Sequence, residues 1–424
     1  MKPVPLHLLP DTATVQADGS LAIGGCDVGE LAGRFGTPLF IYDEAHLRAR
    51  CAEAVAAFGP GRAYYATKAF LCTAMARLAY EEGMHLDVAS GGELYVALRA
   101  GVPANALAFH GNNKSLAELR MAITEGVRHI VVDSFDELDR LESLHAEGLP
   151  APKVLARITP GVHAHTHEFI ATGQDDSKFG FNLGNGDAHK AVDRMRRSLS
   201  VQLEGVHCHI GSNVFEAGNF AKAAEVMAAF AMPLDLPELV LGGGLGVPYV
   251  QGEEAPSISQ WGNVLLDACQ ALGVRSNVCV EPGRSIVAGA AITVYTVGTV
   301  KHIPGVRTYV SVDGGMSDNP RPVLYGSGYE AFLPRAVLAP RPERARLGGK
   351  LCESGDVLIF DAGLPQDVRV NDLLATPVTG AYGHSMASNY NKLTRPPVVF
   401  VRDGAARLVV RRETYEDLVQ CDVG

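Results

Sequence analysis

The chain has 424 residues, 47% of them hydrophobic and 20% charged, and its 37 basic and 47 acidic side chains give a formal net charge of −10. These proportions are globular, so they exclude a disordered chain, a coiled coil and a collagen-like repeat. The negative charge disfavours a nucleic acid or an anionic membrane as a partner. The sequence starts without an apolar signal segment, has no membrane-length apolar run, and its cysteines form no C-x-x-C pair. We therefore expect a cytoplasmic protein with reduced thiols and no membrane partner.

From about Phe40 to Glu281, short apolar runs alternate with longer stretches of helical composition. The runs that we interpret as buried strands are Ala63–Ala66, Leu86–Ala89, Leu107–His110, His129–Val132, Lys153–Ile158, Leu203–His209, Glu238–Leu241 and Asn277–Glu281. Strands that alternate with helices predict a parallel sheet, and this number of them predicts an α/β fold with a TIM-like (β/α)8 barrel. An open doubly wound sheet is the alternative.

Beyond Ala288 the pattern changes to short strand-like runs separated by Gly, Pro and Asp, which predicts a second, mainly β-sheet domain. The runs are Ile292–Val300, Thr308–Val312, Val357–Phe360, Val398–Val401 and Leu408–Arg411. The predicted organisation is an N-terminal segment, 1–37, that joins the β domain, then a barrel at 38–287 and a C-terminal β domain at 288–424.

Polar residues stand at the carboxyl ends of most of the predicted barrel strands, which is where barrel enzymes carry their chemistry. They are Lys68, Asp87, Ser90, His110, Asn112, Arg157, His209, Gly242–Gly244, Glu281 and Arg284. Because parallel strands end on one face of a barrel, these residues should converge there.

Three of these features suggest a chemistry, and each has a structural alternative. A lysine in an apolar setting, such as Lys68, offers a free amine for a Schiff base, but it could also extend to the surface. The Gly242–Gly244 run could turn backbone N–H groups toward a phosphate, or could be a plain tight turn. A carboxylate at Glu281 could keep a pyridinium nitrogen protonated and Arg284 could hold a carboxylate, or the two could form a structural ion pair.

A metal site is disfavoured. Histidines cluster at His163, His165 and His167, and again at His207 and His209. However, the sequence has no H-E-x-x-H motif and no paired Cys/His ligand spacing, so we expect no metal.

Together these residues resemble the fold type III, alanine-racemase-like, pyridoxal-phosphate decarboxylases over nearly the whole chain. The segments that carry the resemblance are YYATKAF, DVASGGEL, HGNNKS, HEFIATG, DSKFGF, HCHIGS, GGGLG, EPGR, RPVLYG, CESGD, TGAY and SMASNYN. HGNNKS, CESGD and SMASNYN resemble the diaminopimelate branch of that family rather than the ornithine or arginine branches.

The resemblance implies pyridoxal 5′-phosphate as cofactor, an amino-acid substrate, and a homodimer with shared active sites. It implies decarboxylation of meso-2,6-diaminopimelate to L-lysine and CO₂, the last step of lysine biosynthesis. Lys68 would form the Schiff base with the cofactor, His209 would lie against its ring, and Glu281 would pair with its ring nitrogen. Cys352 would arrive from the partner subunit together with Glu353 and act as proton donor.

The residues that the resemblance assigns fall into three groups. The catalytic group is Lys68, Cys352 and His209. The cofactor-binding group is Lys68, Asp87, Arg157, His209, Ser212, Gly242, Gly243, Gly244, Glu281, Gly283, Arg284 and Tyr382. The group that binds substrate, including the carboxylate at its far end, is Arg284, Arg321, Tyr325, Glu353 and Tyr382.

Other functions stay open at this point. A paralogue could decarboxylate another amino acid, such as a siderophore or antibiotic precursor, ornithine or lysine. A non-catalytic regulatory homologue is disfavoured because Lys68, Glu281 and Cys352 are all intact. A Schiff-base aldolase on a barrel would not need the glycine run and Glu281 together.

Overall fold

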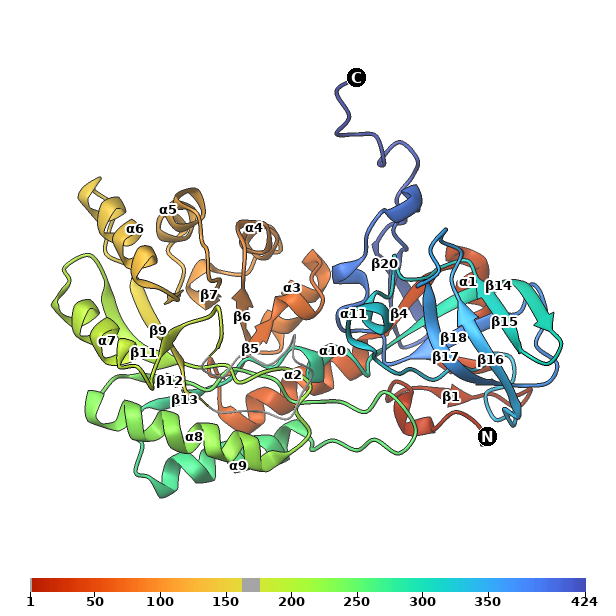
Figure 1. Cartoon of the computed structure of the whole chain (residues 1–424), viewed down its shortest axis with the longest axis horizontal. Coiled ribbons are helices and arrows are strands. Elements are labelled where there is room, and N and C mark those ends of the chain that lie inside the picture. The colour runs from red at the N-terminus through yellow and green to blue at the C-terminus, as the bar shows by residue number, and fades with distance from the viewer. Residues whose placement is uncertain (1, 162–175) are drawn as a thin grey trace. The chain divides into compact units, whose positions relative to one another are not determined.

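The computed structural model describes residues 2–161 and 176–424, and the chain forms two compact units (Figure 1). We call Arg50–Gly246 with Ala255–Ser285 the barrel unit. We call Met1–Ala49 with Val247–Glu254 and Ile286–Gly424 the β unit. No helix in the described ranges has both the length and the apolarity to cross a membrane.

The barrel unit is built on a parallel sheet whose strands follow one another in the order β5-β6-β7-β8-β9-β11-β12-β13. Their bounds are β5 (Tyr64–Ala66), β6 (His85–Val88), β7 (Leu107–Phe109), β8 (His129–Val132), β9 (Lys153–Thr159), β11 (Gln202–His207), β12 (Glu238–Val240) and β13 (Asn277–Cys279); the short β10 (Phe181–Asn182) pairs with β9. A parallel bridge between Ala63 and Val280 joins the two end strands, and the N–H of Tyr64 donates to the carbonyl of Val280 at 2.8 Å. The predicted (β/α)8 barrel is therefore confirmed, with each predicted strand run in place.

Helices alternate with these strands and lie outside them (Figure 1). They are α3 (Thr73–Glu81), α4 (Gly91–Arg99), α5 (Leu116–Glu125), α6 (Phe135–Ala146), α7 (Asp187–Arg197), α8 (Ala217–Ala231) and α9 (Ile258–Ala271); α2 (Glu44–Phe58) and α10 (Arg284–Val287) contain the boundaries between units.

Serine caps explain where several of these helices begin. The side chains of Ser90, Ser115, Ser134 and Ser257 each accept a hydrogen bond from the backbone N–H three residues later, at the start of α4, α5, α6 and α9. At Ser115 the carboxylate of Glu118 in turn accepts a hydrogen bond from the serine N–H, which completes a capping box. The caps end the loops that follow β6, β7 and β8, and so fix the lengths of the loops at the carboxyl ends of those strands.

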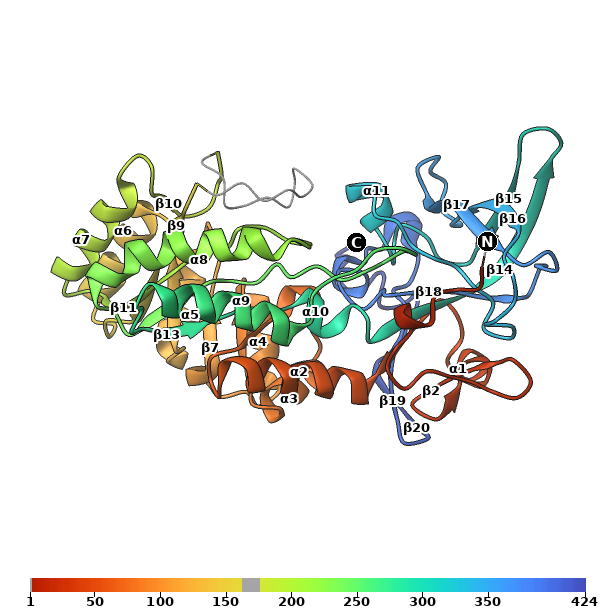
Figure 2. The ribbon, with the colours of Figure 1, turned by 90° about the horizontal axis from the view of Figure 1, so that it is seen from below.

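The β unit contains two sheets. The larger has the order β17-β16-β15-β14-β4-β19-β20, with β18 also paired to β14, and the smaller has the order β1-β2-β3. Figure 2 shows the long β14 beside β15. The bounds are β1 (Thr14–Val15), β2 (Leu21–Ile23), β3 (Cys26–Asp27), α1 (Val28–Phe35), β4 (Leu39–Asp43), β14 (Ala291–Ile303), β15 (Arg307–Val312), α11 (Arg321–Tyr325), β16 (Glu343–Gly348), β17 (Val357–Leu364), β18 (Leu373–Pro377), β19 (Val398–Arg402) and β20 (Ala405–Val410).

The N-terminal segment shares the core of the β unit. Leu21 and Ile23 are fully buried in one hydrophobic cluster with Ile292, Val294 and Val399. Removing these large side chains from water stabilises the unit and holds the N-terminal segment against β14 and β19.

From the sequence we predicted that the barrel begins at residue 38, but the structure shows that the strand β4 belongs to the β unit instead. Leu39–Asp43 pairs antiparallel with β14 and parallel with β19, so it is an interior strand of the β unit's larger sheet. All five of its residues are buried. A run buried on both faces has the same apolar pattern in a barrel and in a covered sheet, and for this reason the pattern did not distinguish them.

Candidate active site

The predicted polar residues of the barrel gather at the carboxyl ends of its strands. Asp87 lies within β6 and Arg157 within β9, while His110 and Glu281 follow β7 and β13. All four are buried. Because every barrel strand runs in the same direction, these ends share one face, as the sequence predicted.

Glu281 is held at both carboxylate oxygens by histidines. Nε2 of His207 lies 2.9 Å from Oε2, and Nε2 of His110 lies 3.0 Å from Oε1. The two imidazole rings meet edge to face, with their centroids 5.0 Å apart. Nε2 of His110 also lies 3.6 Å from Oδ1 of Asp87, so this histidine stands between two carboxylates.

Burial and the neighbouring charges together set the pKa of each residue in this cluster. Burial by itself would raise the pKa of Glu281, but the two histidines outweigh it and hold this pKa well below its usual range. Burial lowers the pKa of His207 to about 4, so its ring is neutral near pH 7. Burial also opposes charge on His110, yet Asp87 and Glu281 together raise its pKa. Glu281 is therefore an anion in the interior of the barrel.

Lys68 stands in the short 3₁₀ helix Thr67–Ala69, directly after β5. Its side chain is exposed, so the apolar setting that the sequence suggested is not present around it. Its charge acts on both Asp87 and His209, which lie on other strand ends of the same unit. An accessible amine therefore lies close enough to the buried Asp87 carboxylate for their charges to interact.

His209 accepts a hydrogen bond at Nδ1 from the N–H of Gly243, over 3.2 Å. Burial lowers the pKa of His209 well below its ordinary value, and the nearby cations Lys68 and Arg157 lower it further. A neutral ring with its proton on Nε2 satisfies both observations.

The Gly242–Gly244 turn tolerates no side chain. A Cβ at Gly243 would lie 2.1 Å from the carbonyl oxygen of Glu281, and one at Gly244 would lie 2.2 Å from that of Gly211. Gly242 has a φ of +68°, which favours glycine. The turn thus passes directly against the backbone of Glu281 and of the segment before Ser212.

Ser212 and Arg284 meet near this turn, where Nη2 of Arg284 donates to the serine Oγ at 2.8 Å. A Cβ at Gly283 would lie 2.9 Å from that of Ala66, so Gly283 permits close packing next to the residues that precede Lys68. A hydroxyl, a guanidinium and a glycine turn together are suited to a phosphate group.

This set of donors fits pyridoxal 5′-phosphate. The Lys68 amine can bind a carbonyl carbon, the anionic Glu281 can hold a proton on a pyridine nitrogen, and the Ser212–Arg284 pair with its glycine turn can bind a phosphate. Arg157 is buried, with Nε 3.7 Å from Oδ1 of Asp133.

The other predicted residues belong to the β unit. Arg321 begins α11, is 3% exposed, and lies with its guanidinium carbon 4.1 Å from the ring centre of Tyr249. Its Nη1 lies 2.5 Å from the hydroxyl of Tyr329. Tyr325 ends the same helix and is partly buried, as is Tyr382, whose φ is +59°.

Cys352 and Glu353 are exposed on one loop. The N–H of Cys352 donates to Oδ1 of Asn391 at 2.8 Å. Asp356 accepts from the N–H of Leu351 at 2.9 Å and from that of Met316 at 2.7 Å, which anchors the base of the loop. The thiol is therefore accessible while its backbone is fixed.

Sequence reasoning missed the roles of His110 and His207, and of the two tyrosines around Arg321. The signal at His207 was its spacing of two from His209 at a strand end, which we considered only as a metal motif. His110, His207 and Glu281 do have ligand-type atoms within 4.8 Å of one another. The contact between His207 and Glu281 is a hydrogen bond, and that between His110 and Glu281 is an ion pair, so neither short N–O distance requires a metal. His163, His165 and His167 lie outside the described residues.

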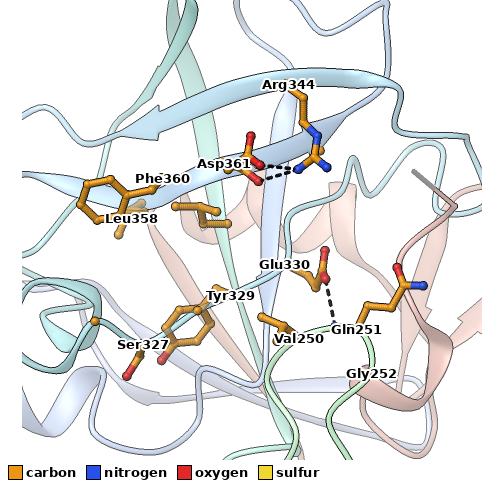
Figure 3. A pocket seen from close by; sticks show the side chains of 15 residues that line it. Val250, Gln251, Gly252, Ser327, Tyr329, Glu330, Arg344, Leu358, Phe360 and Asp361 are labelled. Carbon is orange, nitrogen blue, oxygen red and sulfur yellow. Dashed lines mark hydrogen bonds and ion pairs between the residues drawn. The ribbon is translucent and has the colours of Figure 1, made fainter.

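A separate cavity of about 650 Å³ lies wholly within the β unit (Figure 3). Arg344 and Asp361 form an ion pair at its wall, and Tyr329 lines it. None of the predicted site residues lines this cavity.

Three comparisons bear on this geometry. Residues 44–288 match the family model described as "Pyridoxal-dependent decarboxylase, pyridoxal binding domain". The diaminopimelate decarboxylase of Bacillus subtilis (strain 168) is 47% identical over 430 residues, with 98% of each chain covered, and that of Mycobacterium tuberculosis (strain H37Rv) is 44% identical with 99% of each covered. The crystal structure of diaminopimelate decarboxylase from M. jannaschii in complex with L-lysine has a TM-score of 0.90 at 34% identity and covers 98% of both chains.

Proposed function

We infer the activity of this chain from its family: it belongs to the diaminopimelate decarboxylases, within the pyridoxal-dependent decarboxylases. We propose that it removes CO₂ from meso-2,6-diaminopimelate and forms L-lysine, the last step of lysine biosynthesis. The structural observation that carries the proposal is the buried, ionised Glu281 on the same barrel face as the exposed Lys68 amine.

Pyridoxal phosphate, when bound, takes up the electron pair that remains on the substrate carbon as CO₂ leaves. We propose that Lys68 binds the cofactor's carbonyl carbon and that Glu281 keeps a proton on its ring nitrogen. Since Glu281 stays ionised inside the barrel, it stabilises that positive charge and makes the ring a better electron acceptor.

Further barrel residues would hold the cofactor in place. Ser212 and Arg284, which already share a hydrogen bond, would bind the phosphate with the glycine turn. The neutral His209 would lie against the ring, because a neutral imidazole does not compete with Glu281 for the charge. We assign Asp87 and Arg157 to the same site for their burial and charge.

Arg321 is our candidate for the far end of the substrate. Meso-diaminopimelate differs from lysine by one further carboxylate, which needs a cationic partner. A guanidinium can bind a carboxylate through two parallel hydrogen bonds, and two tyrosines already fix the Arg321 side chain. We propose that Arg284, Tyr325, Glu353 and Tyr382 complete the recognition of the substrate.

We propose that Cys352 delivers the proton to the carbon from which CO₂ departs. Its thiol is exposed and its backbone N–H is anchored to Asn391, so it is accessible and yet fixed in position. On the family resemblance, Cys352 and Glu353 would serve the active site of a partner subunit in a homodimer, and the enzyme would work in the cytoplasm. The barrel unit would hold the cofactor and the β unit would supply the substrate residues.

The proposal is tested by product analysis. Purified enzyme supplied with pyridoxal phosphate and meso-diaminopimelate should release CO₂ and L-lysine in equal amounts, and Lys68→Ala should release neither. Release of CO₂ without L-lysine, or equal turnover by the Lys68→Ala variant, would contradict it.

A further inference from the structure

Glu281 needs only one free oxygen to hold a proton on a pyridine nitrogen, yet histidines contact both of its oxygens. Each histidine comes from a different strand end, His110 after β7 and His207 at the end of β11. Their side chains are 7% and 1% exposed, so this cluster is a buried part of the barrel rather than a solvated surface.

The two histidines differ in what else they face. His110 has a second carboxylate at 3.6 Å, that of Asp87, while the carboxylate paired with His207 among residues 2–161 and 176–424 is that of Glu281. The other charged groups that act on this cluster include Arg157, from β9, and also Lys68 and Glu93 of α4, whose charges both act on Asp87. Arg157 is itself paired with Asp133, at 3.7 Å.

This difference sets the charge of each ring. A buried imidazolium is unfavourable unless carboxylates compensate it. His110 has two carboxylates, and its pKa is raised, whereas burial lowers the pKa of His207 to about 4. The two histidines on this one carboxylate therefore differ in how readily each ring carries a second proton.

We propose that His110 is a positioning residue, an imidazolium cation fixed between Asp87 and Glu281 that keeps Glu281 ionised, while His207 is a neutral hydrogen-bond donor that orients the same carboxylate. This inference deepens the proposed function and rests on it. It predicts that the positive charge of His110 is needed to keep Glu281 ionised. At His207, any side chain that donates a hydrogen bond to Glu281 should be sufficient.

The test compares His110→Gln with His207→Gln in the holoenzyme, because glutamine keeps an N–H donor and removes the possibility of a positive charge. In His110→Gln, loss of the cation makes Glu281 easier to protonate. The acidic limb of kcat, and the pH at which the visible band of the bound cofactor changes, should therefore move upward by about one pH unit or more. We expect kcat to fall about 10- to 100-fold, with KM within about threefold.

His207→Gln keeps the donor, so it should change kcat less than His110→Gln does and should leave the acidic limb in place. Equal shifts of the limb in both variants, or no shift in His110→Gln, would overturn the charge assignment. His85→Gln, a histidine at the start of β6, controls for the loss of any barrel imidazole and should leave the limb where it is. Circular dichroism and thermal unfolding check that each variant is folded.

A second measurement needs no variant. A neutron crystal structure of the wild-type holoenzyme should show hydrogen isotopes on both ring nitrogens of His110, on one nitrogen of His207, and on neither oxygen of Glu281. A neutral His110 would overturn the proposal. If dialysis against a chelator abolished the wild-type activity and Zn²⁺ restored it, the cluster would be a metal site, which would also overturn the proposal.

These outcomes are distinct from failure of the proposed function. If the wild type binds no pyridoxal phosphate or does not turn over meso-diaminopimelate, the proposed function fails. If the wild type does both and His110→Gln keeps its pH profile, only the present inference fails.

Discussion

Nε2 of His207 donates to Oε2 of Glu281 over 2.9 Å, although the two residues are 74 positions apart in the chain. They meet because β11 ends at His207 and β13 ends just before Glu281, and both strands open onto the same face of the barrel. The local sequence around either residue contains no sign of this contact. The barrel brings the partners together, and the anionic carboxylate that results is the feature on which the proposed chemistry depends.

The first prediction concerns the residue that binds the cofactor. Borohydride should bleach the visible band of the holoenzyme and attach the cofactor irreversibly to the peptide that contains Lys68, since a reduced Schiff base cannot be hydrolysed. Mass spectrometry of the digested protein identifies the labelled residue. Label on Lys114, the buried lysine paired with Glu137, or on any other lysine, would show that the assignment is wrong.

The second prediction concerns the glycine turn. Gly243→Ala should reduce cofactor affinity at least about 100-fold or prevent folding, because a Cβ there would meet the carbonyl oxygen of Glu281 at 2.1 Å. Gly218→Ala, in α8 with nothing within 4 Å of the added Cβ, is the matched control and should be neutral or stabilising. Cofactor titration and thermal unfolding measure the two effects. Wild-type cofactor affinity in Gly243→Ala would contradict the close approach.

The third prediction uses His85 to test how pH affects stability. Burial lowers the pKa of His85 to about 4, so the unfolded chain takes up a proton below about pH 6.5 that the folded chain refuses. The free energy of unfolding should therefore fall as the pH drops from about 6.5 toward 4. Between pH 7 and pH 5, His85→Gln should lose about 1 kcal/mol less than the wild type, after allowance for partial exposure.

Urea unfolding at the two pH values, at a fixed cofactor concentration, measures this difference. Any loss of packing in His85→Gln cancels, because each variant is compared with itself. Exposed His302→Gln is the control and should keep the wild-type difference. If the free energy of unfolding changes equally between the two pH values in His85→Gln and in the wild type, His85 does not cause the loss of stability at low pH.

The fourth prediction tests whether active sites are shared in a homodimer. Lys68 lies in the barrel unit and Cys352 in the β unit, so two different inactive variants can be mixed. After subunit exchange, Lys68→Ala with Cys352→Ala should recover up to about a quarter of wild-type activity, since half of the dimers would hold one intact site. Lys68→Ala mixed with the double variant offers no intact site and should recover nothing. No recovery in the first mixture, after verified exchange, would contradict sharing.

The barrel could be predicted from the sequence because its strands are short apolar runs, most of which end in a distinctive residue. Lys68 after β5 and Glu281 after β13 show this directly. For these strands, the apolar pattern of the local sequence agrees with the strand pairing in the folded barrel. Serine caps such as Ser115 add the starts of the helices.

Other features depend on contacts that the sequence does not encode locally. β4 pairs with β14 and β19, which lie about 250 and 350 residues later, so its apolar run could not be assigned to the β unit in advance. β16 was missed because its arginines resemble a solvated loop; Arg344 and Arg346 alternate with buried Ala345 and Leu347. The charges on His110 and His207 depend on which carboxylates face them, and only the fold determines that.

The fifth prediction concerns Arg321, which we propose binds the second carboxylate of the substrate. Arg321→Ala should lower kcat/KM for meso-diaminopimelate by about 2–4 kcal/mol, the scale of losing a charged partner, and should leave the spectrum of the bound cofactor unchanged. Arg344→Ala removes an exposed arginine of the same unit that pairs with Asp361, and should change kcat/KM little. Steady-state kinetics on both variants measures the contrast. Wild-type kcat/KM in Arg321→Ala would remove this arginine from the substrate site.

The most direct test of the account is the ratio of kcat/KM for meso-diaminopimelate to that for L-lysine or L-ornithine, measured by CO₂ release from the wild-type enzyme. A substrate without the second carboxylate leaves a buried guanidinium uncompensated, so we predict a ratio of at least about 100 in favour of meso-diaminopimelate. A ratio near one, or a preference for L-lysine or L-ornithine, would contradict the assignment of the substrate.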